Sequence, residues 1–153
     1  MAPQIRQLTY VSSETKPMSL EERVQLLSKA RSFNESHDIT GILFYNDGLF
    51  FQLLEGPTEV IDFVMKKILN DNRHRGHMVI TDHFTSEGRI FPQWKMGFYH
   101  FSALDKSVGA GLLKNDEKDE IAKLLAKPSV EPTGLLIRSL WQNNWKELIK
   151  PKV

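Results

Sequence analysis

The sequence predicts an α+β fold in which a mixed sheet carries two helices on one face, with two further short helices at the C-terminal end. Three observations predict it: an alternating apolar run near the start, two short apolar runs separated by an Asp-Gly turn, and two amphipathic segments of helical period. The chain has 153 residues, which suits one such domain with a small addition.

The first strand and the first helix have clear local signals. Residues 5–11, IRQLTYV, alternate apolar and polar side chains over most of their length, as a strand does. Residues 19–22, SLEE, form a capping box, in which the Ser19 hydroxyl accepts a backbone N–H and the Glu22 side chain reaches back to the helix start. A helix is therefore predicted over residues 20–34.

Two apolar strands are predicted at residues 40–45 and 49–54. Residues 46–48, Asn-Asp-Gly, separate them, and Asp-Gly between apolar runs is a strong hairpin signal because the turn needs positive φ angles. The near-continuous apolar character of both runs predicts strands in the middle of the sheet, covered on at least one face.

The remaining predicted helix and strands complete the element order of a known fold. A second helix is expected to start at Gly56-Pro57, because proline suits the first turn, and to end near residues 70–72. Residues 78–82 and 97–101 are the last predicted strands. The order βαββαββ is the split βαβ pattern of a ferredoxin-like domain, whose crossover helices pack on one face.

The C-terminal third has a different composition, so we predict an α/β domain over residues 1–103 and a two-helix extension over residues 104–153. A short amphipathic helix is predicted at residues 121–126, after a run of charged residues. Another is predicted at residues 136–148, where apolar side chains recur at helical spacing.

Composition excludes several classes of function. The 20 Lys and Arg residues nearly balance the 19 Asp and Glu residues, so no strong overall field attracts nucleic acid or an anionic membrane. The chain has no cysteine, which excludes disulfides, cysteine-based zinc sites and sensors that work by a cysteine–flavin adduct. No apolar run approaches the roughly 20 residues of a membrane span, and a cytoplasmic location is expected.

One stripe of the first predicted helix has the features of a ligand wall. Leu26, Ala30 and Asn34 recur every fourth residue and so share one face, beside the predicted core stripe of Leu20, Val24 and Leu27. A small residue leaves room for a flat ligand, and a terminal amide can pair with the edge of a heterocycle. The alternative is that Asn34 simply caps the C-terminal end of the helix.

The second predicted helix has a matching stripe. Val60, Val64, Lys67 and Asp71 fall on one face, which places a cation and a carboxylate at one end of an apolar groove. The two stripes together predict a slot that is apolar with polar ends, as ligand sites commonly are. The alternative is a surface ion pair between Lys67 and Asp71.

Tyr10 and Gln52 are candidates for a buried polar pair. Gln52 lies within an apolar strand, and a buried amide without a partner costs roughly 1–3 kcal/mol. Tyr10 lies in the first strand, which should be central, and a buried hydroxyl also needs a partner. A hydrogen bond between them satisfies both; the alternative is that one of them points to solvent.

Two other groups of residues allow simpler interpretations. Trp94 and Met96 precede the last strand, and strand alternation places both on one face, where core packing is the ordinary role. Residues 73–77, RHRGH, form a basic cluster suited to a phosphate or to a solvated loop. His74 and His77 lack the further ligands of a metal site, so no metal is expected.

These pieces together resemble the BLUF family, the domains that sense blue light using FAD. The resemblance covers roughly residues 4–101, and order and spacing agree throughout. The matching segments are residues 8–12 (LTYVS), 30–34 (ARSFN), 39–45 (ITGILFY), 50–57 (FFQLLEGP), 70–74 (NDNRH) and 91–97 (FPQWKMG).

The resemblance implies a photoactive switch. Tyr10 matches the tyrosine that donates an electron and a proton to the excited flavin, and Gln52 matches the glutamine between that tyrosine and the flavin. Trp94 and Met96 match a pair whose placement near the glutamine varies between members. An amide both donates and accepts hydrogen bonds, so it can reverse them by rotation or tautomerisation and shift the flavin absorption to the red.

The resemblance also implies the flavin contacts. Asn34 matches the asparagine on the polar edge of the ring, and Lys67 a basic position near the flavin side chain and its phosphate. Asp71, Arg73 and His74 match an acidic-then-Arg-His segment close to that region. The expected cofactor site comprises these residues together with Leu26, Ala30, Phe33 and Gln52.

Three residues depart from the family pattern. Phe33 stands where relatives often carry Asn or His, so one ring hydrogen bond is expected to be missing, and Ala30 replaces a Ser of some members. Lys67 in place of Arg offers a point charge and not a bidentate fork. FAD is the expected cofactor, with FMN as the alternative.

No output domain is expected in the C-terminal part, so the resemblance implies a short member that signals to a partner protein and forms homo-oligomers. Trp141 and Trp145 are expected to anchor the C-terminal helices on the far side of the sheet; the alternative is that they form a self-association surface. Two rival functions stay open: a flavin reductase that uses a nicotinamide cofactor, and an interaction module that has lost its flavin. The expected function is not enzymatic.

Overall fold

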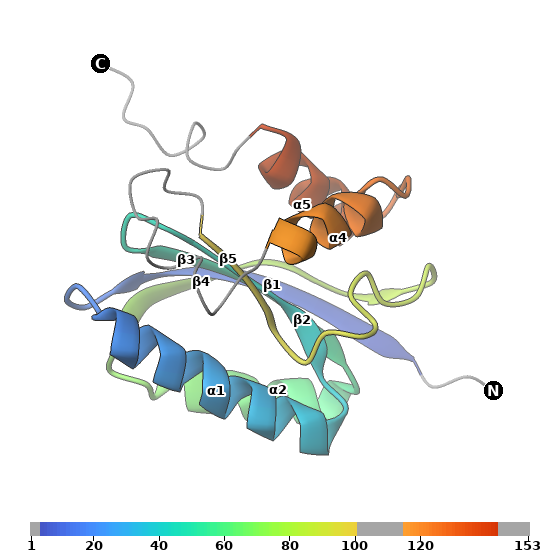
Figure 1. Ribbon diagram of the computed structural model, residues 1–153. Coiled ribbons are helices and arrows are strands. Elements are labelled where there is room, and N and C mark those ends of the chain that lie inside the picture. Colours follow the sequence, from blue (N-terminus) through green and yellow to red (C-terminus); the bar gives the residue numbers. More distant parts are fainter. Residues whose placement is uncertain (1–3, 101–114, 144–153) are drawn as a thin grey trace.

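In the described part of the chain, one five-stranded sheet carries helices on both faces (Figure 1). The computed structural model describes residues 4–100 and 115–143. The elements in chain order are β1 (Ile5–Glu14), α1 (Leu20–His37), β2 (Thr40–Asn46), β3 (Leu49–Gly56), α2 (Thr58–Leu69), β4 (His74–Thr85), β5 (Gly97–His100), α4 (Asn115–Leu125) and α5 (Pro132–Gln142).

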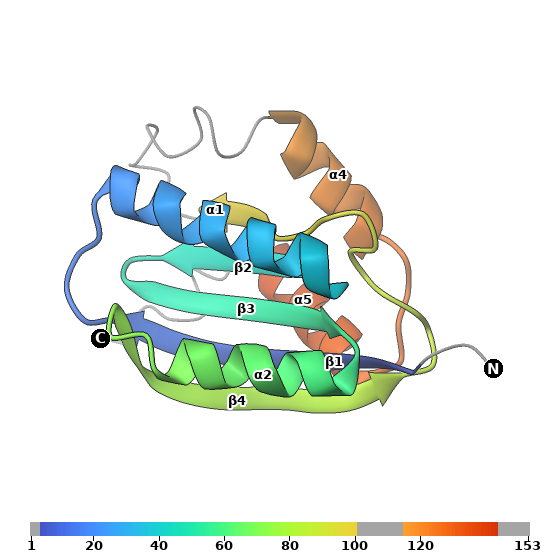
Figure 2. The ribbon, with the colours of Figure 1, turned by 90° about the horizontal axis from the view of Figure 1, so that it is seen from below.

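The sheet has the strand order β4-β1-β3-β2-β5. The first four strands pair antiparallel, and β5 adds parallel to β2, so the sheet is mixed, as predicted. Figure 2 shows α1 and α2 side by side across one face of it. The predicted ferredoxin-like α+β fold is confirmed, with β1 and β3 in the interior of the sheet.

Helix α1 begins as predicted and ends later. Ser19 and Glu22 exchange the two hydrogen bonds of the capping box, at 3.1 and 3.3 Å. The helix continues past the predicted end at residue 34 and stops at Asp38, which adopts a left-handed φ of 58°. Asn34 therefore lies inside the last turn with its side chain buried. The alternative that this side chain is only a helix cap is wrong.

The structure confirms the predicted hairpin between β2 and β3 and corrects the predicted start of the edge strand β4. Asp47 and Gly48 have φ angles of 48° and 84°, which confirms the tight turn with two positive φ angles. Strand β4 begins at His74, four residues before the predicted start, so the interpretation of residues 73–77 as a solvated loop is wrong. The strand continues through this polar stretch with a positive φ of 68° at Gly76 and two register shifts against β1.

Helices α4 and α5 cover the other face of the sheet. Ile121, Leu125, Ile137 and Leu140 form one buried core with side chains from β2 and β3, including Phe44. Both helices start earlier than predicted, at residues 115 and 132.

Trp141 supports the expected packing of the C-terminal helices within the chain. Its ring centroid lies 6.2 Å from that of Phe44 and 4.9 Å from that of Tyr99. Trp145 lies outside the described residues. The division of the chain at residue 103 stays a prediction.

Two glutamates tie the loop after β4 to the linker between α4 and α5. Glu87 accepts hydrogen bonds from the Ser129 hydroxyl at 2.6 Å and from the Val130 backbone N–H at 3.2 Å. In return, Glu131 accepts from the Ser86 backbone N–H at 2.9 Å and from the Thr85 hydroxyl. The two segments therefore hold each other at the end of the sheet, where the chain leaves β4 for β5.

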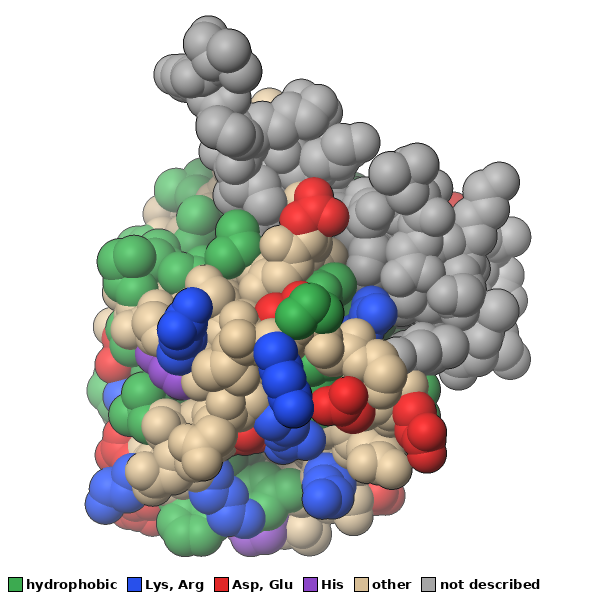
Figure 3. All heavy atoms as spheres, turned by 90° about the vertical axis from the view of Figure 1, so that its left-hand side faces the viewer, with side chains coloured by type: hydrophobic (Ala, Val, Ile, Leu, Met, Phe, Trp, Pro, Cys, Tyr) green, Lys and Arg blue, Asp and Glu red, His purple; other side chains and the backbone are tan. Residues whose placement is uncertain are grey.

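The surface carries charges of both signs. On the described part of the face in Figure 3, Lys and Arg side chains are interspersed with Asp and Glu and with neutral groups. This mixture agrees with the near balance of charge in the sequence. Among the described helices, none is long and apolar enough to cross a lipid bilayer.

Candidate functional site

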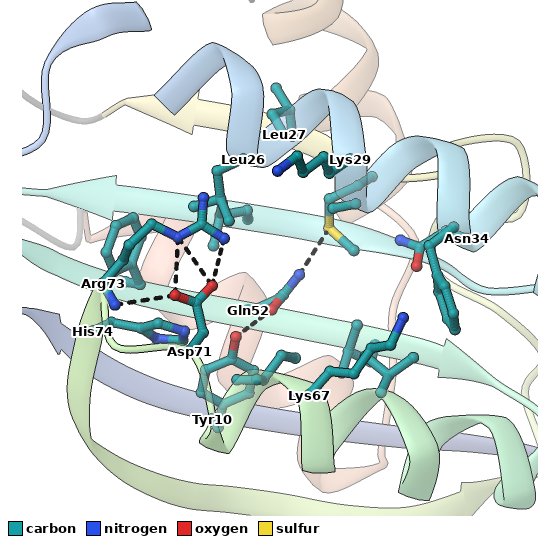
Figure 4. Close-up of a pocket in the computed structure, with 18 of the residues that line it drawn as sticks. Tyr10, Leu26, Leu27, Lys29, Asn34, Gln52, Lys67, Asp71, Arg73 and His74 are labelled. Carbon is teal, nitrogen blue, oxygen red and sulfur yellow. Dashed lines mark hydrogen bonds and ion pairs between the residues drawn. The ribbon is translucent and has the colours of Figure 1, made fainter. Parts of the chain in front are cut away.

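A pocket of about 210 Å³ lies between α1 and α2, above the sheet. Its walls carry all nine residues of the predicted cofactor site, and Figure 4 shows several of them pointing into it. The nine are Leu26, Ala30, Phe33, Asn34, Gln52, Lys67, Asp71, Arg73 and His74. All residues of the two predicted helical stripes line this cavity except Val60, which packs against the neighbouring core.

The rest of the lining is mainly apolar and was not predicted as part of the site. Alternate residues of β3 point the same way, so Phe50 and Leu54 join Gln52 on the pocket side. This period-two signal was available in the sequence. The other residues not predicted for the site are Met18, Leu27, Lys29, Leu43 and Ile68, whereas Val64 belongs to the predicted stripe of the second helix.

Tyr10 and Gln52 form the buried polar pair that the sequence predicted. They are direct partners in the β1–β3 ladder, and the Tyr10 hydroxyl donates a hydrogen bond to Gln52 Oε1. Their side chains are almost fully buried, so the alternative in which one of them faces solvent is wrong. Burial raises the pKa of the Tyr10 phenol, and the charge of Asp71 raises it further. Tyr10 is therefore a neutral phenol at physiological pH.

Met96 completes the contacts of the glutamine. Gln52 Nε2 lies 3.3 Å from the Met96 sulfur, which is a weak acceptor. Asn34 Nδ2 donates to the Lys95 backbone carbonyl at 2.6 Å, and Arg31 Nε donates to the Met96 carbonyl at 2.8 Å. Helix α1 thereby fixes the segment that carries Met96 against the pocket.

Trp94 lies on the opposite face of the sheet from Met96. Its ring stacks on Phe91 at 5.7 Å and packs against the core under α4 and α5. The expectation that Trp94 and Met96 share a face is therefore wrong. Residues 91–96 form turns and bends, so strand alternation does not apply to them.

A second polar group closes one end of the pocket. Arg73 Nε donates to the two carboxylate oxygens of Asp71 at 2.9 and 3.1 Å, and the Arg73 backbone N–H donates at 3.0 Å. These bonds hold the pKa of Asp71 below its ordinary value. The alternative surface pair between Lys67 and Asp71 is wrong, because Asp71 pairs with Arg73 and the Lys67 ammonium lies 4.2 Å from the Phe33 ring centre.

His74 lies beside this ion pair. Its Nδ1 is 2.9 Å from the Ser12 hydroxyl and 3.0 Å from Nε2 of His77. Burial, together with the neighbouring His77, lowers the pKa of His74 to about 4. His74 is therefore neutral at physiological pH. Over residues 4–100 and 115–143, no group of three metal-ligating side chains is found.

The pocket lies wholly inside a region with a known family signature. A family model described as sensors of blue-light using FAD, BLUF, matches residues 5–97. The chain belongs to the BLUF family. As a BLUF protein it is a blue-light photoreceptor with a flavin cofactor.

Curated relatives of this BLUF chain include much longer proteins. The photoactivated adenylate cyclase subunit beta of Euglena longa is 37% identical over 139 residues, which cover 90% of this chain and 16% of that protein. The blue light- and temperature-regulated antirepressor BluF of Escherichia coli K12 is 44% identical over 50 residues, covering 33% of this chain and 12% of that protein. The chain thus spans less than a fifth of these relatives.

Solved BLUF structures share the fold. BlrB in its dark state has a TM-score of 0.63 and 27% identity, with 82% of this chain and 98% of BlrB covered. Klebsiella pneumoniae BlrP1 with FMN and cyclic diGMP has a TM-score of 0.70 and 25% identity, covering 91% of this chain and 35% of that one. BlsA in its photo-activated state has a TM-score of 0.64 at 24% identity, covering 97% of this chain and 98% of BlsA.

The residues of the pocket fit a flavin. Leu26 and Ala30 on α1 face Val64 and Ile68 on α2, which suits a flat apolar ring system. The buried amides of Asn34 and Gln52 add donors and acceptors for the polar edge of such a ring.

Proposed function

We propose that the chain holds FAD between α1 and α2 and that Tyr10 and Gln52 form its light-driven switch. A single observation carries this proposal: the buried hydrogen bond from the Tyr10 hydroxyl to Gln52 Oε1 opens onto the pocket. The bound flavin supplies the absorption of blue light and an excited state that accepts an electron.

Tyr10 acts as the donor of one electron and one proton. Because its pKa is raised, the phenol keeps its proton in the dark and must lose it together with the electron. Gln52 Oε1 accepts the hydrogen bond from that proton, so Gln52 is the group that relays it. Gln52 responds by reversing its hydrogen bonds, through rotation or tautomerisation of the amide.

The other pocket residues bind and orient the cofactor. Asn34 pairs with the polar edge of the ring, and Leu26 and Ala30 form one wall. Phe33 extends the same wall toward solvent, and Lys67 lies near the flavin side chain. FMN is the alternative ligand.

The remaining polar residues, Asp71, Arg73 and His74, form one end of the site. Arg73 and Asp71 neutralise each other, and His74 carries no charge at neutral pH. This end therefore supports an uncharged part of the cofactor better than a phosphate.

The output of the switch is a signal to a partner protein and not a reaction. The cyclase relatives are many times longer than the matched region, so their activity does not transfer to this chain. The Escherichia coli relative is named an antirepressor, which supports signalling through a partner. A homo-oligomeric state and a cytoplasmic location stay predictions.

An absorption spectrum before and after blue light tests the proposal, with Tyr10→Phe as the key variant. Wild-type protein should show a flavin band that shifts modestly to the red and returns in darkness. Tyr10→Phe should keep the flavin and lose the shift. Tyr45→Phe is the matched control, because the Tyr45 hydroxyl donates to Glu14 and does not line the pocket.

Other outcomes favour the rival functions. A flavin band that bleaches in the dark on addition of NADH indicates a reductase. Protein that takes up no added flavin indicates an interaction module. A full red shift in Tyr10→Phe would contradict the switch while leaving flavin binding intact.

A further inference from the structure

An aromatic stack bridges α1 and α2 beside the mouth of the pocket. The Phe33 and Phe63 rings are nearly parallel, at 15°, with centroids 5.8 Å apart. On α1 the His37 ring stacks on Phe33 at 3.9 Å and 7°. Phe33 lines the pocket, whereas Phe63 lies next to it with 51% of its surface exposed. An exposed ring held parallel to a pocket wall offers a face for another flat ring.

Two lysines line the pocket, one from each helix. Lys29 lies four residues before Phe33 on α1, and Lys67 four residues after Phe63 on α2, so each lysine shares a helix face with its ring. The Lys67 ammonium lies 4.2 Å from the Phe33 centroid and 5.2 Å from that of Phe63. Within the described part of the chain, neither lysine has a carboxylate in ion-pair distance.

These lysines are the available cations of the pocket lining. Arg73 is committed to Asp71, and His74 is neutral at physiological pH. Figure 4 places Lys67 toward the Asn34 end of the pocket, away from the Arg73–Asp71 pair. A phosphate-bearing tail of a bound molecule is therefore drawn to the mouth between Lys29 and Lys67.

We infer that Phe63, stacked on Phe33, is the adenine site of the cofactor and makes the pocket selective for FAD over FMN. This inference rests on the proposed function, since it concerns the same pocket. The pyrophosphate of FAD passes between Lys67 and Lys29, and the adenine stacks on the exposed face of Phe63. FMN has the phosphate without the adenine, and riboflavin has neither, so the three ligands separate the contributions.

The test is titration of the flavin-free full chain with riboflavin, FMN and FAD, followed by quenching of flavin fluorescence. The Kd for FAD should be about tenfold below that for FMN, which corresponds to one stacked base. Phe63→Ala should raise the FAD Kd to the FMN value and leave the riboflavin Kd unchanged. Phe63→Trp should keep the preference for FAD.

Matched controls separate stacking from charge and from folding. Phe84→Ala removes an aromatic ring of similar exposure on β4 and should change none of the three Kd values. Lys67→Gln should raise the Kd for FMN and FAD alike, by about threefold to tenfold, and spare riboflavin. Lys66→Gln changes a neighbouring lysine that does not line the pocket and should have little effect.

The outcomes distinguish this inference from the proposed function. Equal Kd values for FAD and FMN in the wild type overturn the adenine site and leave a flavin pocket. An equal loss of affinity for all three flavins in Phe63→Ala also overturns it, because Phe63 would then only support the fold. If none of the three flavins binds, the proposed function and this inference both fail.

Discussion

Tyr10 and Gln52 lie directly opposite each other on β1 and β3, and the Tyr10 hydroxyl donates its hydrogen bond to the Gln52 carbonyl. A hydroxyl also accepts hydrogen bonds, so Tyr10 keeps a partner when the Gln52 amide turns over. Turning the amide breaks the weak interaction of Gln52 Nε2 with the Met96 sulfur. The pair can therefore keep a hydrogen bond with the amide in either orientation, and the orientation seen in the structure has the added contact with Met96.

Replacing the glutamine should abolish the light response. Gln52→Leu removes the amide and leaves the buried Tyr10 hydroxyl without its partner, at a cost of roughly 1–3 kcal/mol in stability. Flavin should still bind, and the light-minus-dark spectrum should show no red shift. Gln25→Leu, at an exposed position of α1, is the control and should keep the shift. A normal shift in Gln52→Leu would rule out the amide as the switch.

Met96 and Trp94 should differ in their effect on recovery after light. Met96→Leu keeps the volume but removes the acceptor of the Gln52 N–H, so the amide orientation seen in the structure loses stability and dark recovery should slow. Trp94→Phe, on the opposite core, should leave the recovery rate nearly unchanged. Time-resolved absorption measures both rates. The reverse result would place Trp94, and not Met96, beside the glutamine.

Glu55 should be a major contributor to stability. Its fully buried carboxylate accepts hydrogen bonds from the Gln7 side chain at 2.8 Å and from the Ile90 and Phe91 backbone N–H groups at 2.7 and 2.8 Å. Glu55→Gln replaces one acceptor oxygen by a donor and should lower the free energy of unfolding by roughly 1–3 kcal/mol. Urea denaturation measures this difference.

An exposed glutamate of α1 provides the control for that experiment. Glu35→Gln removes a charge where no buried donor depends on it, so the expected change stays within about 0.5 kcal/mol. Equal effects of the two substitutions would show that the buried carboxylate is replaceable by a neutral amide.

His74 should make stability depend on pH in the acidic range. Its pKa in the folded protein is about 4, below the ordinary value of 6.5. Between these pH values the unfolded chain therefore binds a proton at His74 and the folded chain does not. The free energy of unfolding should therefore fall as pH falls from about 6.5 to about 4, and be highest above this range.

The size of this effect is reduced by solvent, because His74 is only partly buried; about 1–2 kcal/mol is expected over the range. His74→Asn should flatten the slope relative to wild type in urea denaturation at several pH values. Parallel curves for the two proteins would show that His74 does not titrate with folding.

Local signals predicted most of the fold because each is short-range. The capping box at Ser19 and the turn at Asp47 depend on residues a few positions apart, and both are present. Strand β4 was predicted too short because its first residues are polar and pair with β1 through a bulge, which no periodic pattern reveals.

The pocket was predictable where periodicity applies. Leu26, Ala30 and Asn34 follow the helical repeat, and all three line the cavity. Strand alternation gave a wrong prediction for Trp94 and Met96, because the turns of residues 91–96 place their side chains on opposite faces of the sheet. The partners of Lys67 could not be predicted, because its contact with Phe33 joins two helices whose spacing only the tertiary fold sets.

The hydrogen bonds accepted by Glu87 and Glu131 bear on which part of the chain can fold on its own. The family match stops at residue 97, but α4 and α5 bury Phe44 and Phe51 of the sheet and are fastened to the loop after β4. A chain cut at the end of that match would present a bare aromatic surface to water. We therefore expect the sheet and the C-terminal helices of this protein to unfold together.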